Sequence, residues 1–278
     1  MRFLANPKRK HRRKKKGQLL LWTRLPNHRL ESDARETRAA HAGVRLYIRS
    51  RMSKKLRDVV TRMPPEEVPK HLRGLAQKVR QLLVSIGSSI SRSNERDAVT
   101  NLAKRTAAEL EQLASFYPSS IEGVAWCTRN LFEVNLVLRY VLLDPKHVNE
   151  WMGQAAGDEK EITEGLLSLT GDESRPEVRV LRNRLSQIDE ICKRHGIEPS
   201  HPFRIADLAR DVGRTDDYKA LYKLFSKYVH PSSYVINMPD EDRRGDETLN
   251  IFLMHATSYS GDTYGRLDDW FKGQRPPH

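Results

Sequence analysis

The sequence has few cysteines and no long apolar run, and these two shortages exclude several classes of protein. Cys127 and Cys192 are the only cysteines in 278 residues, which excludes a disulfide-dense scaffold and fits a reducing compartment. No apolar run approaches the ~20 residues that a membrane span needs, and the run at 19–22 is too short for the core of a signal peptide. We therefore expect a soluble, cytoplasmic protein with no membrane association.

The common motifs of cofactor and metal chemistry are missing as well. The chain has no Gly-x-Gly-x-x-Gly fingerprint, no P-loop and no His-Glu-x-x-His sequence. Neither cysteine has a Cys-x-x-Cys partner, and a metal site needs clustered ligands. Four histidines stand alone in the sequence, and we expect them to be ordinary surface or core residues: His147, His195, His201 and His255. The sequence therefore predicts no cofactor and no metal.

The positive charge is concentrated at one end of the chain. The net charge is +13, but residues 1–57 hold 19 Lys and Arg against 3 Asp and Glu, so the remainder carries −3. The block at 8–16 has nothing to bury, and we predict a disordered basic tail over 1–57. Three interpretations stay open: an arm that contacts nucleic acid through phosphate, a solvated tail, or a reading frame extended upstream of a start at Met52.

The rest of the chain has apolar residues at helical spacing, with proline and glycine at the breaks. We expect a short helix and linker over 58–93 and a helical bundle domain over 94–278, in which the helix over 147–169 is interrupted near Gly153 and Gly157. The first expected helical segment runs from 54 to about 85, with breaks at the prolines at 64, 65 and 69. The other expected helices cover about 94–117, 119–143, 147–169, 176–195, 202–212, 216–230 and 247–271. No strand alternation and no internal repeat is present. The sequence predicts an all-α fold, a bundle of about six to seven helices behind a disordered basic extension.

The stretch 119–143 is the expected centre of this bundle. It is apolar on nearly every face, as is typical of a buried helix, yet it carries Arg129, Glu133 and Arg139. Charges inside a core are costly unless they are paired and hydrogen-bonded. Arg129 and Glu133 could form an ordinary salt bridge, but a helix favours the acidic residue first, and this pair has the reverse order. The charges therefore indicate a candidate functional site.

A second candidate lies in the helix that Pro231 ends. Tyr222, Ser226 and His230 follow one another at four-residue spacing, which places them in one row on a helix. A histidine at the end of a helix, with hydroxyl groups behind it, can act as a general acid or base near neutral pH. The alternative is a capping histidine bonded to the last helical carbonyls, with tyrosines that only pack.

Three segments together carry a family resemblance. They are RNLFE at 129–133, LRYVLLD at 138–144 and Y-x3-SKYVHPS at 222–232. This combination resembles a bacterial all-helical family of unknown function, over roughly residues 94–270. That family is in turn distantly similar to HEPN domains, helical bundles that include ribonuclease toxins and abortive-infection proteins.

The resemblance to HEPN nucleases has one departure. Those nucleases carry an Arg-x4-6-His motif on a single helix, and no arginine precedes His230 at that spacing. Lys223 and Lys227 are poor substitutes, because a lysine lacks the planar fork that grips a phosphate through two donors. The resemblance is restored only if Arg129 comes across from the central helix.

What the resemblance implies is a HEPN-like protein that acts on RNA, of the toxin or phage-defence type. In this hypothesis His230 is the acid or base of a metal-independent ribonuclease, Arg129 holds the scissile phosphate and Glu133 orients one of them. A homodimer is also implied, since HEPN-like proteins often build the site across one. The supporting residues would be Tyr222, Ser226 and Tyr140. The alternative is a non-catalytic bundle that binds a ligand or partner, with a buried network of Arg129, Glu133 and His230.

Overall fold

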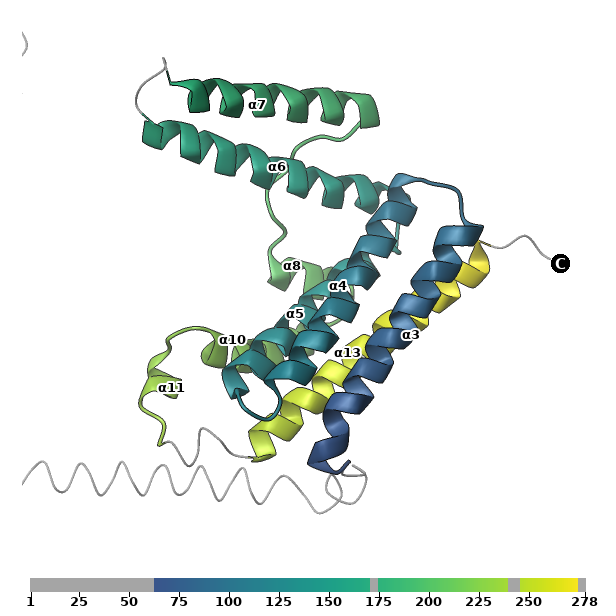
Figure 1. The fold of residues 1–278 in the computed structure, drawn as a ribbon, viewed down its shortest axis with the longest axis vertical. Helices are drawn as coiled ribbons and strands as arrows, with labels where there is room; N and C mark the ends of the chain where they lie inside the picture. The colour runs from purple at the N-terminus through teal and green to yellow at the C-terminus, as the bar shows by residue number, and fades with distance from the viewer. Residues whose placement is uncertain (1–62, 171–174, 240–245, 275–278) are drawn as a thin grey trace, which may run out of the picture. The chain divides into compact units, whose positions relative to one another are not determined.

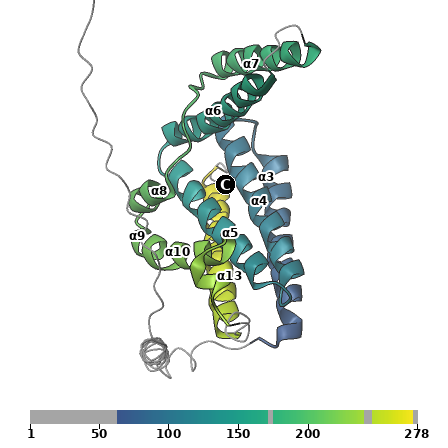
Figure 2. The same cartoon turned by 90° about the vertical axis from the view of Figure 1, so that its left-hand side faces the viewer.

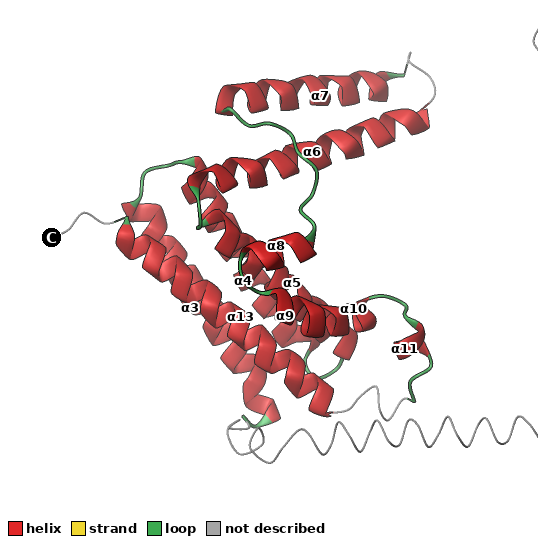
Figure 3. Ribbon diagram, turned by 180° about the vertical axis from the view of Figure 1, so that it is seen from behind, coloured by secondary structure: helices red, strands yellow, loops and turns green. Residues whose placement is uncertain are grey.

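The computed structural model describes residues 63–170, 175–239 and 246–274, and no strand occurs in them (Figure 1 and Figure 3). The predicted all-α fold is confirmed for this part of the chain, while the basic tail over 1–57 lies outside it. None of the helices described here is long and apolar enough to cross a membrane. The six longest helices are α3 (Val68–Ser89), α4 (Asn94–Phe116), α5 (Ile121–Val141), α6 (Pro145–Thr170), α7 (Pro176–His195) and α13 (Asp246–Gly273).

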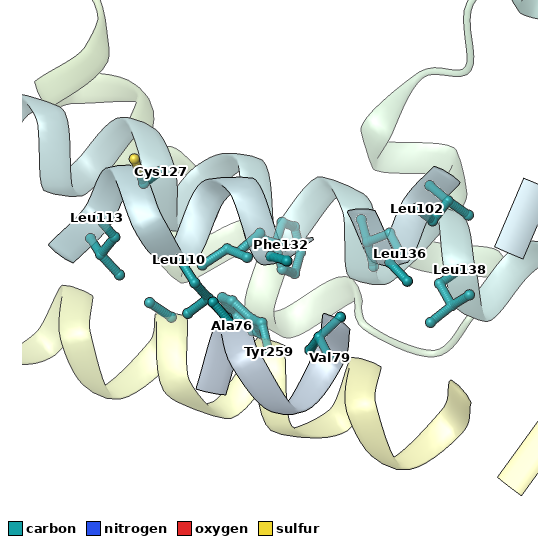
Figure 4. Packing of buried hydrophobic residues seen from close by; sticks show 14 of the residues in the cluster. Ala76, Val79, Leu102, Leu110, Leu113, Cys127, Phe132, Leu136, Leu138 and Tyr259 are labelled. Atoms are coloured by element: carbon teal, nitrogen blue, oxygen red, sulfur yellow. The ribbon is translucent and has the colours of Figure 1, made fainter. Parts of the chain in front are cut away.

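Helix α5 lies at the centre of the bundle, as its apolar sequence predicts. It contacts α4, α6, α10 and α13, and the short helix α8 (Ile205–Asp211). The Ser120 hydroxyl caps its start by accepting from the Gly123 N–H at 3.0 Å, which satisfies a free helix donor. Phe132 is fully buried, and its ring centre lies 5.1 Å from that of Tyr259 on α13 (Figure 4). Any polar side chain on α5 is therefore held on a rigid, well-packed element.

Helix α3 belongs to the same core. The sequence predicts it as part of a short helix and linker over 58–93, apart from the bundle. Its buried residues, such as Ala76 and Val79, lie in one apolar cluster with residues of α4, α5 and α13 (Figure 4). Only residues 90–93 separate α3 from α4. The apolar stripe of α3 is therefore covered by the bundle, and the described residues before 94 pack as part of it.

Helices α6 and α7 form a hairpin across one end of the bundle (Figure 1). The interruption expected at Gly153 and Gly157 is absent, because α6 runs unbroken through both. A Cβ at Gly153 would lie 2.2 Å from the Glu198 carbonyl oxygen, and one at Gly157 would lie 2.1 Å from the Ser200 carbonyl oxygen. The glycines therefore let the chain after α7 cross directly over α6, with the Ser200 N–H donating to the Gly153 carbonyl at 3.0 Å.

The helix expected over 216–230 is broken into three pieces. They are α9 (Thr215–Asp217), the π-helical turn η2 (Tyr218–Tyr222) and α10 (Lys223–Val229), and one more turn, α11 (Ser233–Ile236), follows. In Figure 2, α8, α9 and α10 lie on the side of α5 away from α3. Phe225 is fully buried and anchors α10 edge-on against Phe252 of α13. Because α10 packs on α5, its row of polar residues comes close to the charges of the central helix.

Candidate functional site

Arg129 uses all three of its guanidinium nitrogens in contacts with other side chains. Its Nε donates to Glu133 Oε1 at 2.9 Å, and its Nη2 donates to the Tyr222 hydroxyl at 2.7 Å. Its Nη1 lies 2.9 Å from Nε2 of His230. The guanidinium carbon also stands 4.8 Å from the centre of the Tyr222 ring. One guanidinium thus gathers residues from two distant segments, which we call the Arg129 cluster: Arg129, Glu133, Tyr222 and His230.

The contact with Arg129 fixes which ring nitrogen of His230 accepts a hydrogen bond. A guanidinium has only donors, so Nε2 of His230 is the acceptor in this contact and the ring carries its proton on Nδ1. The backbone N–H of His230 donates to the Ser226 carbonyl at 3.2 Å, which closes α10 and fixes where the side chain starts. His230 is exposed. The arrangement places a solvent-accessible proton acceptor directly beside a permanent cation.

Tyr222 contributes a protonated hydroxyl to the cluster. Burial raises the pKa of this hydroxyl to about 12, and the negative charge of Glu133 acts in the same direction, while Arg129 opposes both. Its ring is held by Tyr218, with ring centres 5.1 Å apart, and by Phe132 at 5.9 Å. The oxygen accepts from Arg129, and the hydroxyl donates its proton to the Glu133 carboxylate, a hydrogen bond that also raises the pKa of Tyr222.

Ser226 and Tyr140, the other two predicted supporting residues, are bonded elsewhere. The Ser226 hydroxyl donates to the Tyr222 carbonyl at 2.8 Å, one turn back in the chain. The Tyr140 hydroxyl donates to Glu150 Oε2 at 2.7 Å, and its ring stacks on His147 with centres 3.8 Å apart. The structure therefore brings four of the six predicted site residues together and places Tyr140 toward α6.

Arg139, the third charge of the central helix, lies in a separate polar network with α13. Its Nη2 and Nε donate to Oδ1 and Oδ2 of Asp262 at 2.8 and 3.0 Å, a two-point contact. Asn135 and Arg266 also donate to Asp262 Oδ2, at 2.7 and 2.9 Å. Burial acts to raise the pKa of Asp262, but these donors and the two guanidinium charges outweigh it and hold the pKa below its usual value. We call this group the Arg139 cluster: Asn135, Arg139, Asp262 and Arg266.

A cleft of about 480 Å³ opens beside Glu133, where α4, α5, α6 and α8 meet. Its polar side chains are Asn101, Arg105, Glu133 and Gln154, and its aromatic ones are Trp151 and Phe203. Of these, only Glu133 was predicted from the sequence, because the others come from three segments, α4, α6 and the chain before α8, whose meeting depends on the tertiary fold. Glu133 therefore belongs to both the Arg129 cluster and the wall of the cleft.

Glu109 holds the cationic side of this cleft in place. Its fully buried carboxylate pairs with Arg105 and accepts from Asn130 Nδ2 at 3.1 Å. Burial raises the pKa of Glu109, although Arg105 and Asn130 oppose the rise. Burial and the neighbouring Glu109 also raise the pKa of the Cys127 thiol, so it stays protonated. The sequence alone could have indicated this buried carboxylate, because Glu109 falls between Leu102 and Leu113 on the apolar stripe of its helix.

Metal ligands do not cluster in the described part of the chain: no group there joins three or more His, Cys, Asp or Glu side chains that could hold an ion. The chemistry that the Arg129 cluster offers comes from a guanidinium, an imidazole and a phenol. Donors of this kind bind an anion, and the imidazole can move a proton.

Comparison with known proteins gives one family. The profile described as a family of unknown function (DUF5677) matches residues 103–245. No curated protein and no solved structure matches the chain. The matched region begins in α4 and ends after α11, so it contains every member of the Arg129 cluster. Because the match spans just over half of its 278 residues, the chain belongs to this family of unknown function, DUF5677.

Proposed function

We propose that this protein is a HEPN-like ribonuclease of the toxin or phage-defence type, which acts on RNA in a bacterial cytoplasm. The observation that carries the proposal is the 2.9 Å contact between Arg129 Nη1 and His230 Nε2. HEPN nucleases place this arginine and histidine on one helix, whereas here they come from α5 and from the end of α10. A cation that holds a phosphate next to a proton acceptor is the minimum that phosphodiester cleavage requires.

The proposed reaction uses the ribose 2′-hydroxyl of the RNA as the nucleophile. His230 Nε2 accepts the hydroxyl proton while the 2′-oxygen forms a bond to phosphorus. The P–O5′ bond breaks, the 5′-oxygen leaves with the electron pair and it takes a proton from water. The products are a 2′,3′-cyclic phosphate and a 5′-hydroxyl, and no oxidant or metal enters the balance.

The other members of the Arg129 cluster have supporting roles in this reaction. An incoming phosphate oxygen takes the Arg129 Nη1 donor that His230 now occupies, which frees Nε2 to accept a proton. Glu133 holds Nε of Arg129 and so fixes the plane of the guanidinium. The Tyr222 hydroxyl turns its proton from Glu133 to a second phosphate oxygen, where charge develops in the transition state.

The test compares the full-length wild type with Arg129→Ala and His230→Ala. Each purified protein is incubated with a mixed-sequence RNA, and the ends of the fragments are identified by mass spectrometry. Induced expression in a bacterial host, with growth and total RNA followed together, runs in parallel. We expect fragments with 2′,3′-cyclic phosphate ends and growth arrest for the wild type, and a loss of at least about 100-fold in cleavage for both variants.

Arg73→Ala and His71→Ala are the matched controls, because both residues are exposed and lie on α3, away from the cluster. They should cleave RNA as the wild type does. Intact RNA with soluble, folded wild type would overturn the proposal. Cleavage that persists undiminished in both Arg129→Ala and His230→Ala would do the same.

A non-catalytic ligand- or partner-binding bundle is the second candidate, and one observation favours it. All three nitrogens of Arg129 already have partners within the protein, as a purely structural polar network would have. Under this alternative, RNA stays intact, and Arg129→Ala and His230→Ala lower the melting temperature. Under the ribonuclease proposal, cleavage is lost while a melting scan shows that most of the folded stability remains.

The proposal includes RNA contact through the basic tail over 1–57. The support is its charge, 19 Lys and Arg against 3 Asp and Glu. Lys14, Lys15 and Lys16 changed together to Gln should weaken RNA binding and make it less dependent on salt, because fewer counterions are released. Unchanged binding and an unchanged salt slope would remove the tail from the proposal.

A homodimer is also part of the proposal, with α6 as the contact surface. Ile162, Leu166 and Leu169 lie at helical spacing on α6 and are 64%, 47% and 82% exposed. Glu164 of α6 and Arg179 of α7 are also exposed, so a charge of each sign is available to a second copy. Light scattering should give twice the chain mass of 32.1 kDa and the single mass for Leu166→Glu. A single mass for the wild type at micromolar concentration would contradict this.

A further inference from the structure

The cleft beside Glu133 is continuous with the Arg129 cluster through one shared side chain. Glu133 lines the cleft and accepts from Arg129 Nε at 2.9 Å. The two residues are four positions apart on α5, about 6 Å along its axis. A ligand that fills the cleft therefore lies within reach of a phosphate bound at Arg129, at about the span of a single nucleotide.

The aromatic walls of the cleft suit a flat ring. Trp151 reaches it from α6, and Phe203 reaches it from the chain that crosses α6 at Gly153 and Gly157. The Phe203 ring is braced edge-on by Tyr140, with centres 5.1 Å apart. Stacking on such side chains binds the face of any base, in single-stranded RNA above all.

The polar groups of the cleft offer both donors and acceptors for the edge of that ring. Arg105 is a donor that the buried Glu109 keeps in position, and Gln154 has a buried amide nitrogen with no hydrogen-bond partner. Glu133 supplies an acceptor, and the exposed Asn101 supplies both kinds. The edges of nucleobases carry the same mixture of donors and acceptors.

We propose that this cleft binds the nucleobase on the 5′ side of the scissile bond, whose 3′-phosphate lies at the Arg129 cluster. The inference rests on the proposed function and deepens it, because it assigns a base preference to the cleavage. The size supports it as well, since small-molecule sites commonly occupy 300–1,000 Å³ and this cleft has about 480 Å³. Two sources share this chemistry, a base within RNA and a free nucleotide.

The test measures binding of the four nucleoside 3′-monophosphates to the full-length protein by calorimetry. Ribose 3-phosphate, which lacks a base, and a short non-cleavable RNA with 2′-O-methyl sugars are run beside them. We expect binding of at least one nucleotide and none of ribose phosphate. Trp151→Ala should weaken nucleotide binding at least about tenfold, as expected for loss of one stacked base. Gln154→Leu, a milder change, should weaken it severalfold and alter which base is preferred.

Phe116→Ala is the matched control, because Phe116 is a partly exposed aromatic residue of α4 outside the cleft. It should bind nucleotides as the wild type does. Much tighter binding of the RNA than of the nucleotides identifies RNA as the ligand, and equal binding identifies a free nucleotide. Equal affinity of wild type, Trp151→Ala and Gln154→Leu for every probe, with all three folded, would overturn the inference.

The two proposals fail in different ways. If RNA is cleaved but Trp151→Ala keeps the wild-type affinity and the same cut sites, the cleft does not bind the base and the ribonuclease stands. If nucleotides bind and Trp151→Ala abolishes that binding while RNA stays intact, the cleft stands as a nucleotide site and the ribonuclease fails.

Discussion

The central helix carries two polar clusters that each pair an arginine with a carboxylate but differ in the other groups that the pair contacts. In both, an arginine of α5 meets a carboxylate, and the exposure is similar: 20% and 29% for Arg129 and Glu133, and 15% and 32% for Arg139 and Asp262. In the Arg139 cluster, the carboxylate accepts from two guanidinium groups and an amide, and it joins α5 to α13. In the Arg129 cluster, one guanidinium is divided among a carboxylate, a phenol and an imidazole.

Burial therefore does not separate the two clusters, but proton chemistry does. The Arg139 cluster contains no group that exchanges a proton near neutral pH, and its opposite charges face one another directly. Such a group contributes to orientation and stability. The Arg129 cluster contains an exposed imidazole and a protonated phenol whose hydrogen bonds an anion could take over. The difference supports the proposal that Arg139 has a structural role and Arg129 a chemical one.

The largest expected effect is on RNA cleavage, when Arg129 is changed. Arg129→Lys keeps the positive charge but loses the planar fork that now serves three partners. We expect RNA cleavage to fall at least about 100-fold, because one positioned donor to the transition state is lost. Arg139→Lys should leave the rate per folded molecule within about twofold. Equal losses in both variants would show that the two arginines do not have these different roles.

The second prediction concerns the free energy of unfolding, for which we expect the change at Arg139 to have the larger effect. Arg139→Ala leaves Asp262 partly buried with fewer partners, and we expect a loss of about 2 to 3 kcal/mol, below the range for a fully buried pair. Arg129→Ala should cost about 1 kcal/mol, the usual value for lost hydrogen bonds. Urea unfolding followed by circular dichroism measures both. A larger loss for Arg129→Ala would make its cluster the structural one.

Members of the Arg129 cluster could be predicted from the sequence because a charged residue is conspicuous in a helix that is otherwise apolar. Arg129, Glu133 and Arg139 stand out because α5 is otherwise apolar, and Pro231 places His230 at a helix end. The family of unknown function was also predicted correctly, while its similarity to HEPN domains stays a prediction. What the sequence could not supply is which charge faces which helix, since that depends on how α10 and α13 pack on α5.

The misplaced residues have equally specific causes. Tyr140 is seven residues beyond Glu133, about 10 Å along the helix, so it cannot reach the same cluster. Ser226 follows Tyr222 by one turn, and a serine there bonds readily to the carbonyl four residues back. The cleft was missed because its walls are far apart in the sequence, from Asn101 to Phe203 and beyond.

The third prediction uses pH to test the Arg139 cluster. The folded state holds the pKa of Asp262 below its usual 3.8, so the carboxylate stabilises the fold at pH values above about 3.8. That stabilisation is lost as the pH falls through the lower, folded-state pKa. Asp262→Asn should therefore be less stable than the wild type at neutral pH, with a gap that narrows as the pH falls below about 4. Asp269→Asn, an exposed residue of α13, controls for loss of a charge. A gap that widens in acid would contradict the assignment.

The smallest expected effect is at Tyr222. Tyr222→Phe keeps the ring that packs on Phe132 and Tyr218 and removes only the hydroxyl. We expect cleavage to fall about tenfold, as for loss of one weaker donor, and stability to change by less than about 1 kcal/mol. Single-turnover kinetics measure the effect on cleavage, and a melting scan measures the effect on stability. Full activity would confine the proposed chemistry to Arg129 and His230.

The π-helical turn η2 has a consequence for how this segment tolerates insertions and deletions. A π turn holds one residue more than the α-helix around it, and each residue of an α-helix advances the side chains by about 100°. The turn therefore lets α9 and α10 keep different rotational phases, one set by α8 and the other by the burial of Phe225. Removing a single exposed residue such as Ala220 would make the segment regular and force one end to give up its packing. The length of this short segment, more than its composition, keeps the phenol of Tyr222 aimed at α5.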